Sequence, residues 1–408
     1  MSLQFLLRYH ARTGQEEARE MVEESLRHMG NGGIYDHLGG GFSRYSTDQF
    51  WLVPHFEKML YDNALLASVY VQTYRLTGHL SYRVTAEETL DYLLRDLRHQ
   101  EGGLFSSQDA DSEGVEGKYY VWSQQELESL LGRDNAHLFG RYYGVTPHGN
   151  FEGHNILHIP DGPAAASRDL GLTLEELNHQ LKPLRETLLA QRSKRVPPAT
   201  DDKLLTAWNG LALRAFSEAA LILDRADYRD AAEHIADFLL RELHVGSRLL
   251  RTWKGGIAHL AGYLEDYALV INGLLALHSV TFSHRWLHEA NVLTEEMVRL
   301  FWDDGSERFY DVGSDHETLI VRPNDLSDNA MPSGSSAATE ALIKMATITG
   351  ETSYLDKASR SLRTVVPLVA RYPTGFGNWL QVMEIYLTRP IELVIIGDPA
   401  ERVTRALL

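Results

Sequence analysis

Apolar residues recur at helical spacing along almost the whole chain, and the helices that this spacing predicts are of two alternating kinds. One kind is apolar around most of its circumference, as in NGLALRAFSEAALILD, which is typical of a helix buried on several sides. The other kind carries charges around a single apolar face, as in YRDAAEHIADFLLREL, and should pack outside the first kind. The twelve predicted helices cover residues 15–29, 57–77, 81–98, 123–143, 173–192, 203–223, 227–243, 264–281, 285–302, 331–349, 353–371 and 376–388.

The connections between these helices alternate as well. Those that lead from a buried to an exposed helix are short and end in an aromatic residue, namely Tyr82, Tyr228, Trp286 or Tyr354. Those that lead back are long, glycine-rich and strand-like, as in GGIYDHLGGGFSRYS. Such hairpins can close into a ring of six inner and six outer helices whose long loops crowd one rim. We therefore predict an all-α fold, an (α/α)6 toroid over residues 1–389 with short β-hairpin loops on one rim; an open solenoid of the same hairpins is the alternative.

Two segments fit the ring poorly. Residues 144–172 are rich in turn-forming residues and are predicted to form an extended insertion. After Pro390, the run IELVIIGDPAERVTRALL indicates one buried strand and the beginning of a helix. A single strand cannot pair with itself, so we expect residues 390–408 to be the start of a truncated C-terminal α/β element.

Charge and motifs limit the partners of the chain. Its net charge of −17 repels nucleic-acid phosphates and anionic lipids, so we expect no nucleic-acid and no membrane partner. The chain contains no cysteine, which excludes disulfides and thiolate nucleophiles in these residues. Nucleotide-binding, serine-hydrolase and HExxH motifs are absent. The helical i, i+4 pair of a zinc enzyme is not formed by the loop histidines His37, His55, His148, His154, His158 and His259, so we expect neither a cofactor nor a metal. The start of the chain has no signal-peptide pattern, and we expect a cytoplasmic protein.

Carboxylates gather at or just before the predicted buried helices. Helix capping explains any one of them, but in a ring they would face one cavity and perturb one another's pKa values. Asp109 and Asp111 lie two residues apart, so on an extended segment both side chains would point to one face; acid/base chemistry, sugar binding, a plain turn and a cation site all stay open. His37 follows Asp36 in a loop, where a carboxylate would orient the imidazole ring. The predicted catalytic residues are Asp36, His37, His55, Glu57, Asp62, Asp109, Asp111, Asp202, Glu265 and Asp266.

Tryptophans lie in or beside the long loops, where their rings could stack on sugars or pack in the core. Arg44 could hold an anionic substituent or neutralise the acids around it. The predicted substrate-binding residues are Arg44, Trp51, Tyr61, Asn63, Trp122, Trp208, Asn209, Trp253, His259 and Asn329.

Five segments together resemble the YyaL and spermatogenesis-associated protein 20 family over essentially the whole chain. They are GGIYDHLGGGFSRYSTDQFWLVPHFEKMLYDNA, GGLFSSQDADSEG with its trailing YYVW, GNFEGHNIL, DDKLLTAWNGL and LEDYA. The resemblance implies a ring like those of six-hairpin glycosidases and N-acylglucosamine 2-epimerases, which agrees with the periodicity. It also implies that a thioredoxin-like domain precedes this region in full-length members and is a partner of it.

The sequence thus favours a carbohydrate-active or carbohydrate-binding ring that takes a small sugar or an oligosaccharide. Two of the carboxylates would act as acid and base in hydrolysis. In epimerisation, His37, His55 or His259 would move the proton beside a carbonyl group, and Arg44 or another cation would stabilise the enolate. The alternative is a non-catalytic ring that binds a ligand or a protein for the thioredoxin-like domain.

Overall fold

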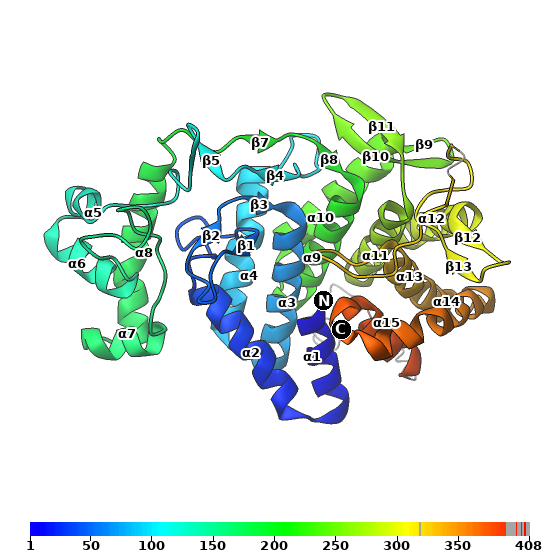
Figure 1. Ribbon diagram of the computed structural model, residues 1–408, viewed down its shortest axis with the longest axis horizontal. Helices are drawn as coiled ribbons and strands as arrows, with labels where there is room; N and C mark the ends of the chain where they lie inside the picture. The colour runs from blue at the N-terminus through cyan, green and yellow to red at the C-terminus, as the bar shows by residue number, and fades with distance from the viewer. Residues whose placement is uncertain (318–319, 389–396, 398–400, 402–403, 405–408) are drawn as a thin grey trace.

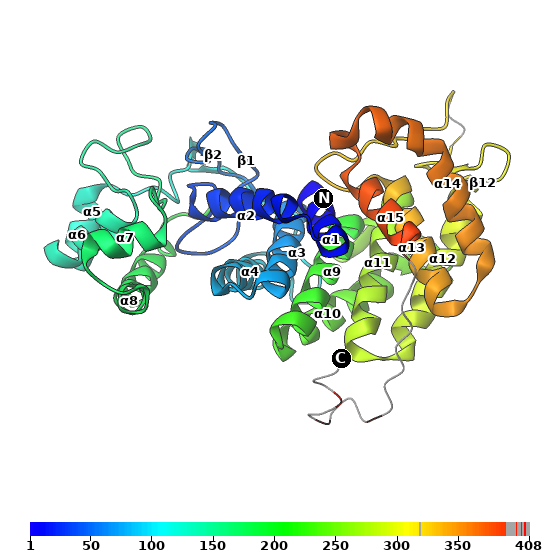
Figure 2. The same cartoon turned by 90° about the horizontal axis from the view of Figure 1, so that it is seen from below.

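The computed structural model describes residues 1–317, 320–388, 397, 401 and 404. Within them, six helices line a ring (Figure 2). Each inner helix packs on the next, and the last packs on the first, which closes the ring. The inner helices are α1 (Ser2–Thr13), α3 (Leu60–Thr77), α9 (Thr206–Leu223), α11 (Leu264–Thr281), α13 (Gly334–Thr349) and α15 (Gly377–Leu387).

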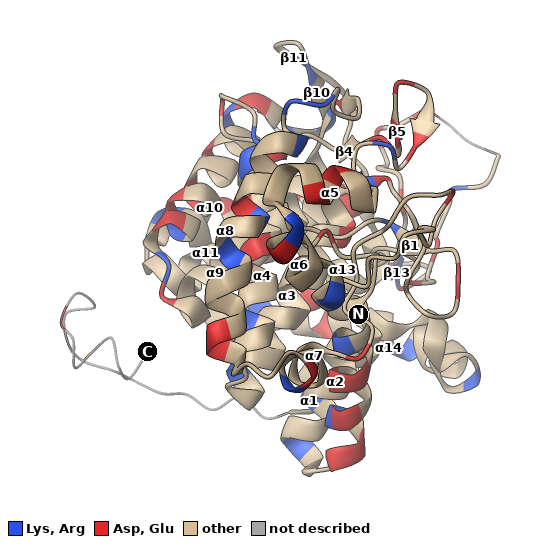
Figure 3. Cartoon of the chain, turned by 90° about the vertical axis from the view of Figure 1, so that its left-hand side faces the viewer, with Lys and Arg blue, Asp and Glu red and all other residues tan. Residues whose placement is uncertain are grey.

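Outer helices cover the ring, each packed on the inner helix beside it in sequence. On α2, acids and bases alternate (Figure 3) and form pairs such as Arg19 with Glu16, as expected of a helix with one solvent-facing side. The predicted (α/α)6 toroid is confirmed. The outer helices in the described part of the chain are α2 (Glu16–Asn31), α4 (Leu80–Tyr92), α10 (Ala226–Phe238), α12 (His284–Phe301) and α14 (Thr352–Arg371); a π-helical turn follows α4 (Leu93–Leu97) and α10 (Leu239–Leu243).

Small residues allow the inner helices to approach closely. A Cβ atom on Gly210 would lie 2.7 Å from the backbone of Leu269, and one on Gly273 would lie 2.9 Å from the carbonyl oxygen of Gly210. These two glycines therefore set the contact between α9 and α11. The aromatic residues that end the short connections, Tyr82, Tyr228, Trp286 and Tyr354, are all buried in the first turns of the outer helices.

Two parts of the ring differ from the prediction. Residues 2–13, where no helix was expected, form the inner helix α1. The helix predicted over 123–143 breaks at Gly132 into α5 (Gln124–Leu131) and α6 (Arg133–Tyr142). With α7 (Pro163–Leu170) and α8 (Leu174–Arg192), these helices form a separate unit beside the ring (Figure 1).

The apolar faces of this unit, which we call the side unit (α5–α8), pack on one another. Leu127, Phe139, Leu177 and Leu188 form its core. Helix α7 lies inside the predicted extended insertion and begins at a proline, which suits the first turn of a helix. The predicted C-terminal element of residues 390–408 lies outside the described residues, apart from the isolated positions 397, 401 and 404.

The long connections carry short strands that pair across the rim, as predicted (Figure 1). Met59 pairs with Ser107, which pairs with Asp201, and Leu204 pairs with Trp253, so loops from different hairpins are joined by backbone hydrogen bonds. In the part of the chain that the structure describes, no helix has the length and apolar character needed to cross a bilayer. The strands are β1 (Tyr45–Ser46), β2 (Pro54–His55), β3 (Lys58–Met59), β4 (Ser107–Gln108), β5 (Asp111–Ser112), β6 (Val115–Glu116), β7 (Thr200–Asp201), β8 (Leu204–Leu205), β9 (His244–Val245), β10 (Arg248–Lys254), β11 (Ile257–Ala261), β12 (Trp302–Asp303) and β13 (Arg308–Phe309).

Candidate functional site

A cavity of about 530 Å³ opens at the rim where four inner helices begin. We call it the central cavity. Its wall includes Tyr61 of α3, Trp208 of α9, Glu265 of α11 and Gly334 of α13. Its volume lies within the range of roughly 300 to 1,000 Å³ that is typical of small-molecule sites. The rim is therefore open where the helix starts converge.

Three carboxylates line the central cavity: Glu265, Asp311 and Asp325. Glu265 accepts a hydrogen bond from Arg251 at 2.8 Å. Asp311 accepts one from the backbone N–H of Asp325 at 2.7 Å. Burial raises the pKa of Asp311 to about 6, and the negative charges of Asp325 and Glu265 act in the same direction. Asp311 can therefore hold or release a proton near neutral pH.

Aromatic rings stand beside these carboxylates. The rings of Tyr61 and Trp208 meet edge to face with centroids 4.8 Å apart. Tyr263 also lines the cavity, and its ring lies under the guanidinium of Arg251 at 4.6 Å. A ligand in this cavity would meet flat apolar surfaces as well as charges.

A second cavity of about 510 Å³ lies next to the first, bounded by α1, α3 and the loop before α3. We call it the side cavity. Arg44 and Ala330 line both cavities. Asp62 and Trp51 belong to the side cavity alone.

Asp62 is the most unusual group of the side cavity. Its Oδ2 atom is buried and has no hydrogen-bond partner among the described residues. Burial raises the pKa of Asp62 to about 7, although the nearby positive charge of Arg44 opposes this shift. Asp62 therefore keeps its proton to a higher pH than an exposed aspartate does.

Arg44 is held between the two cavities by Glu57. Its guanidinium donates a hydrogen bond to Glu57 at 3.2 Å. His55 lies further out, 2.8 Å from Glu116. Glu57 thus positions the Arg44 side chain, and neither Glu57 nor His55 lines either cavity.

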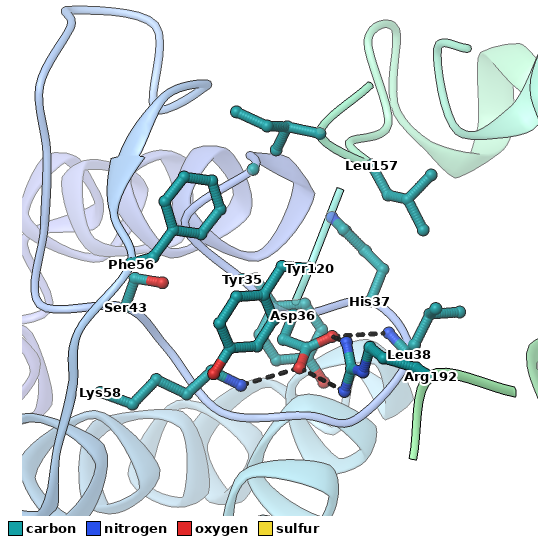
Figure 4. Close-up of a pocket in the computed structure, with 12 residues that line it drawn as sticks. Tyr35, Asp36, His37, Leu38, Ser43, Phe56, Lys58, Tyr120, Leu157 and Arg192 are labelled. Carbon is teal, nitrogen blue, oxygen red and sulfur yellow. Dashed lines mark hydrogen bonds and ion pairs between the residues drawn. The ribbon is translucent and has the colours of Figure 1, made fainter. Parts of the chain in front are cut away.

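Asp36 and His37, which the sequence placed in a pocket, lie instead at the junction between the ring and the side unit (Figure 4). Arg192 and Lys58 both donate hydrogen bonds to Asp36, and the space around them measures about 20 Å³, enough for one water molecule. His37 is buried with its Nε2 atom 2.9 Å from the carbonyl oxygen of Gly32, and burial lowers its pKa to about 4. These two residues join parts of the fold and do not meet the rim cavities.

Three other predicted acids are exposed outside both cavities. Asp109 accepts a hydrogen bond from the backbone of Ala110, and Asp111 lies in the exposed β5–β6 hairpin. Asp202 pairs with Lys254 at 2.5 Å on the surface. Neither Asp109 nor Asp111 lines either rim cavity.

Asp266, Asn63 and Asn209 are buried and act in the fold. Asp266 accepts hydrogen bonds from the backbone N–H groups of Tyr263 and Ala207, so it caps α11 and ties it to α9. Burial raises the pKa of Asp266 to about 7. Capping, the ordinary explanation of such an acid, is confirmed for Asp266.

Asn63 and Asn209 repeat one arrangement in two hairpins. Asn63 accepts a hydrogen bond from the N–H of Phe42 and donates to the carbonyl oxygens of Phe42 and Met59. Asn209 makes the same three bonds with Leu104 and Leu205. These bonds use the amide groups to tie the long connections to the inner helices, and neither asparagine lines the two cavities.

Of the remaining predicted binding residues, one lines a cavity and three lie elsewhere. Asn329 lines the central cavity. Trp122 is fully buried in the core of the side unit, Trp253 packs against Phe238, and His259 is exposed on β11. Core packing, the alternative for the tryptophans, therefore holds for Trp122 and Trp253.

Asp311 and Tyr263 are cavity residues that the sequence prediction missed. Tyr263 directly precedes the predicted buried helix that carries Glu265, so its place in the chain was a usable signal. Asp311 lies in the connection after α12, far from any predicted helix start. Tertiary hydrogen bonds bring it to the cavity: its backbone bonds to Leu264 and Pro323, and its carboxylate accepts from the backbone N–H of Asp325.

Comparison with known proteins identifies relatives of this chain. Spermatogenesis-associated protein 20 from Homo sapiens is 33% identical over 427 aligned residues, which cover 96% of this chain and 54% of that protein. The chain therefore spans about half the length of the curated relatives that it matches. No protein-family model matches the chain.

Two solved structures share the fold. A GH76 alpha-mannanase from Bacteroides thetaiotaomicron superposes with a TM-score of 0.56 and 12% identity, over 94% of this chain and 82% of that chain. Cellobiose 2-epimerase from Bacillus thermoamylovorans superposes with a TM-score of 0.50 and 10% identity, over 81% of this chain and 66% of that chain. At these identities the likeness shows the ring fold alone.

Proposed function

The chain belongs to the spermatogenesis-associated protein 20 family, of whose curated members it spans about half the length, and we propose that its ring is a carbohydrate-active domain. The observation that carries the proposal is the central cavity, where carboxylates and aromatic rings meet at the starts of the inner helices. Aromatic faces pack on the apolar faces of sugar rings, and carboxylates bind hydroxyl groups. The fold shared with a mannanase and a sugar epimerase supports a sugar as the ligand.

The proposed chemistry is acid/base catalysis by two carboxylates. Asp311, whose pKa lies near 6, is the proposed acid, and Glu265 in its ion pair with Arg251 is the proposed second carboxylate. Asp311 would give a proton to the leaving oxygen while the bond between that oxygen and the anomeric carbon breaks. Water would add to the anomeric carbon and pass its proton to Glu265. The burial of Asp311 and the pairing of Glu265 with a cation give the two carboxyl groups different environments, which suit these two roles.

Histidine-based epimerisation has less support. Among the described residues that line the two cavities there is no histidine. His37 and His55 are held by Gly32 and Glu116, and His259 is exposed outside the cavity walls. We therefore favour hydrolysis of a glycosidic bond. The thioredoxin-like partner domain implied by the family resemblance and the cytoplasmic location stay predictions.

The experiment is incubation of the protein with a panel of oligosaccharides and monosaccharides in D2O, followed by proton NMR. New anomeric signals that grow with time are expected and would mean hydrolysis. Deuterium at a ring carbon without cleavage would favour epimerisation instead. If saturation-transfer spectra also show no contact with any sugar of the panel, the ring is not a carbohydrate domain.

A further inference from the structure

The two rim cavities are of nearly equal size and share two lining residues. They measure about 530 and 510 Å³, and Arg44 and Ala330 are the residues that line both. Each cavity has its own tryptophan: Trp208 in the central cavity and Trp51 in the side cavity. Each also has its own carboxyl group whose pKa is raised by burial, Asp311 and Asp62. The side cavity thus offers a ligand one tryptophan and one partly buried carboxyl group, as the central cavity does, within a more aliphatic wall.

Trp51 is held in its position at an energetic cost. Its φ angle is 62°, a left-handed conformation that is unfavourable for a bulky residue. Asp48 fixes the surrounding loop because its carboxylate accepts hydrogen bonds from the N–H groups of Phe50, Leu52 and Val53. The carbonyl oxygen of Trp51 accepts a hydrogen bond from Ile34. Backbone strain that is maintained by so many bonds is typical of ligand sites.

Asp62 and Arg44 leave groups available to a ligand. The buried Oδ2 atom of Asp62 has no hydrogen-bond partner among the described residues, and a ligand hydroxyl would satisfy it. Arg44 is 45% exposed and bonded to Glu57, while a guanidinium has five N–H donors. It can therefore donate to a ligand that passes from one cavity to the other.

We propose that the sugar bound by this domain occupies both cavities at once, so that the substrate class is a chain of at least two linked sugar units, with one unit beside Trp208, the next beside Trp51 and Arg44 at their junction. This proposal rests on the proposed carbohydrate function. It adds that a monosaccharide fills only part of the site. It also assigns Asp62 and Trp51 to binding the second unit.

The experiment is isothermal titration of the protein with glucose, cellobiose and cellotriose, and with mannose, mannobiose and mannotriose. In at least one series the disaccharide should bind at least tenfold more tightly than the monosaccharide, with one disaccharide per chain. Equal affinity within both series, or two independent monosaccharide sites per chain, would overturn the proposal. If no sugar of either series binds, the proposed function itself fails, which is a different result.

Single substitutions can test the contribution of each cavity to sugar binding separately. Gln49 is exposed and lines the side cavity, so Gln49→Trp should fill that cavity without disturbing the core, and Gln49→Ala is its size control. Gln49→Trp should abolish the disaccharide advantage and leave monosaccharide affinity unchanged, whereas Gln49→Ala should retain the advantage. Trp51→Phe should remove a change in tryptophan fluorescence that only disaccharides cause. Trp208→Phe should remove a change that monosaccharides and disaccharides both cause. An undiminished disaccharide advantage in both Gln49→Trp and Trp51→Ala would contradict the proposal.

Discussion

Arg192 donates two hydrogen bonds to Asp36, at 2.7 and 2.8 Å, across 156 positions of the sequence. The pair joins the end of α8 to the loop before α3, and Lys58 completes it at 2.8 Å. Burial alone would raise the pKa of Asp36, but the positive charges of Arg192 and Lys58 lower it well below its ordinary value. The side unit is thus attached to the ring by a buried group that is charged at neutral pH.

Replacing Arg192 with methionine should lower the free energy of unfolding by about 3 to 5 kcal/mol, because it leaves Asp36 buried with one cation fewer. Urea denaturation followed by circular dichroism measures the change. The control is Arg229→Met, which breaks an exposed pair with Asp230 and should change stability by less than about 0.5 kcal/mol. Equal effects of the two variants would mean that the buried pair does not hold the unit in place.

Asp62 should make the protein less stable as the pH rises. Its folded pKa of about 7 lies above the ordinary 3.8, so its contribution is fully present below pH 4 and is lost as the pH rises through 7. The side chain of Asp62→Asn cannot ionise, so the variant does not lose this contribution. Its free energy of unfolding relative to wild type should therefore rise by about 2 to 4 kcal/mol between pH 4 and pH 8, since each pKa unit corresponds to about 1.4 kcal/mol. Urea titrations at both pH values measure this, and a difference that does not change with pH would contradict it.

Asn63→Ala and Asn209→Ala should each lower the free energy of unfolding by about 2 to 4 kcal/mol. The two effects should be similar because each substitution removes three buried hydrogen bonds at equivalent places in two hairpins. Thermal or urea unfolding provides the comparison. Asn135→Ala on the exposed side of α6 is the control and should stay within about 0.5 kcal/mol of wild type. A cost as small as that of the control at either position would refute the structural role.

Phe282 follows α11 with a φ of 54°, whereas glycine occupies the corresponding places after α3 and α13. Phe282→Gly should therefore be more stable than Phe282→Ala by about 1 kcal/mol, since only glycine adopts this conformation without steric cost. At Leu355, inside α14, the order should reverse and alanine should be the better residue by about 1 kcal/mol. Differential scanning calorimetry of the four variants measures both differences. The same order at both positions would show that the left-handed backbone is not the cause.

The ring could be predicted from the sequence because the two kinds of helix differ in composition over their whole length. The sequence could not show which hairpins close it. Leu127 and Leu177 recur at the same spacing as ring residues, yet both belong to the separate core of the side unit. Periodicity shows that a face is buried, and does not identify the element that covers it.

The candidate site was predictable to the extent that it follows the helix starts. Glu265, Asp62 and Trp208 line the cavities because they lie in the first turns of inner helices. Asp36 was misplaced because its partner Arg192 is distant in sequence, and Asp311 was missed because the contact with Asp325 is also tertiary. Such contacts decide whether an acid is a structural or a chemical group.

The central claim is that Asp311 acts as an acid in the cavity at the ring mouth. Asp311→Asn keeps an oxygen that can accept the hydrogen bond from Asp325 but cannot supply the proton, and Asp230→Asn on the surface of α10 is the matched control. The initial rate of release of new reducing ends should be measured by NMR on the oligosaccharide that the wild type cleaves. The account predicts a rate 10² to 10⁴ times lower for Asp311→Asn, roughly the share of a general acid, with sugar affinity retained and Asp230→Asn unchanged. A wild-type rate in Asp311→Asn would contradict it.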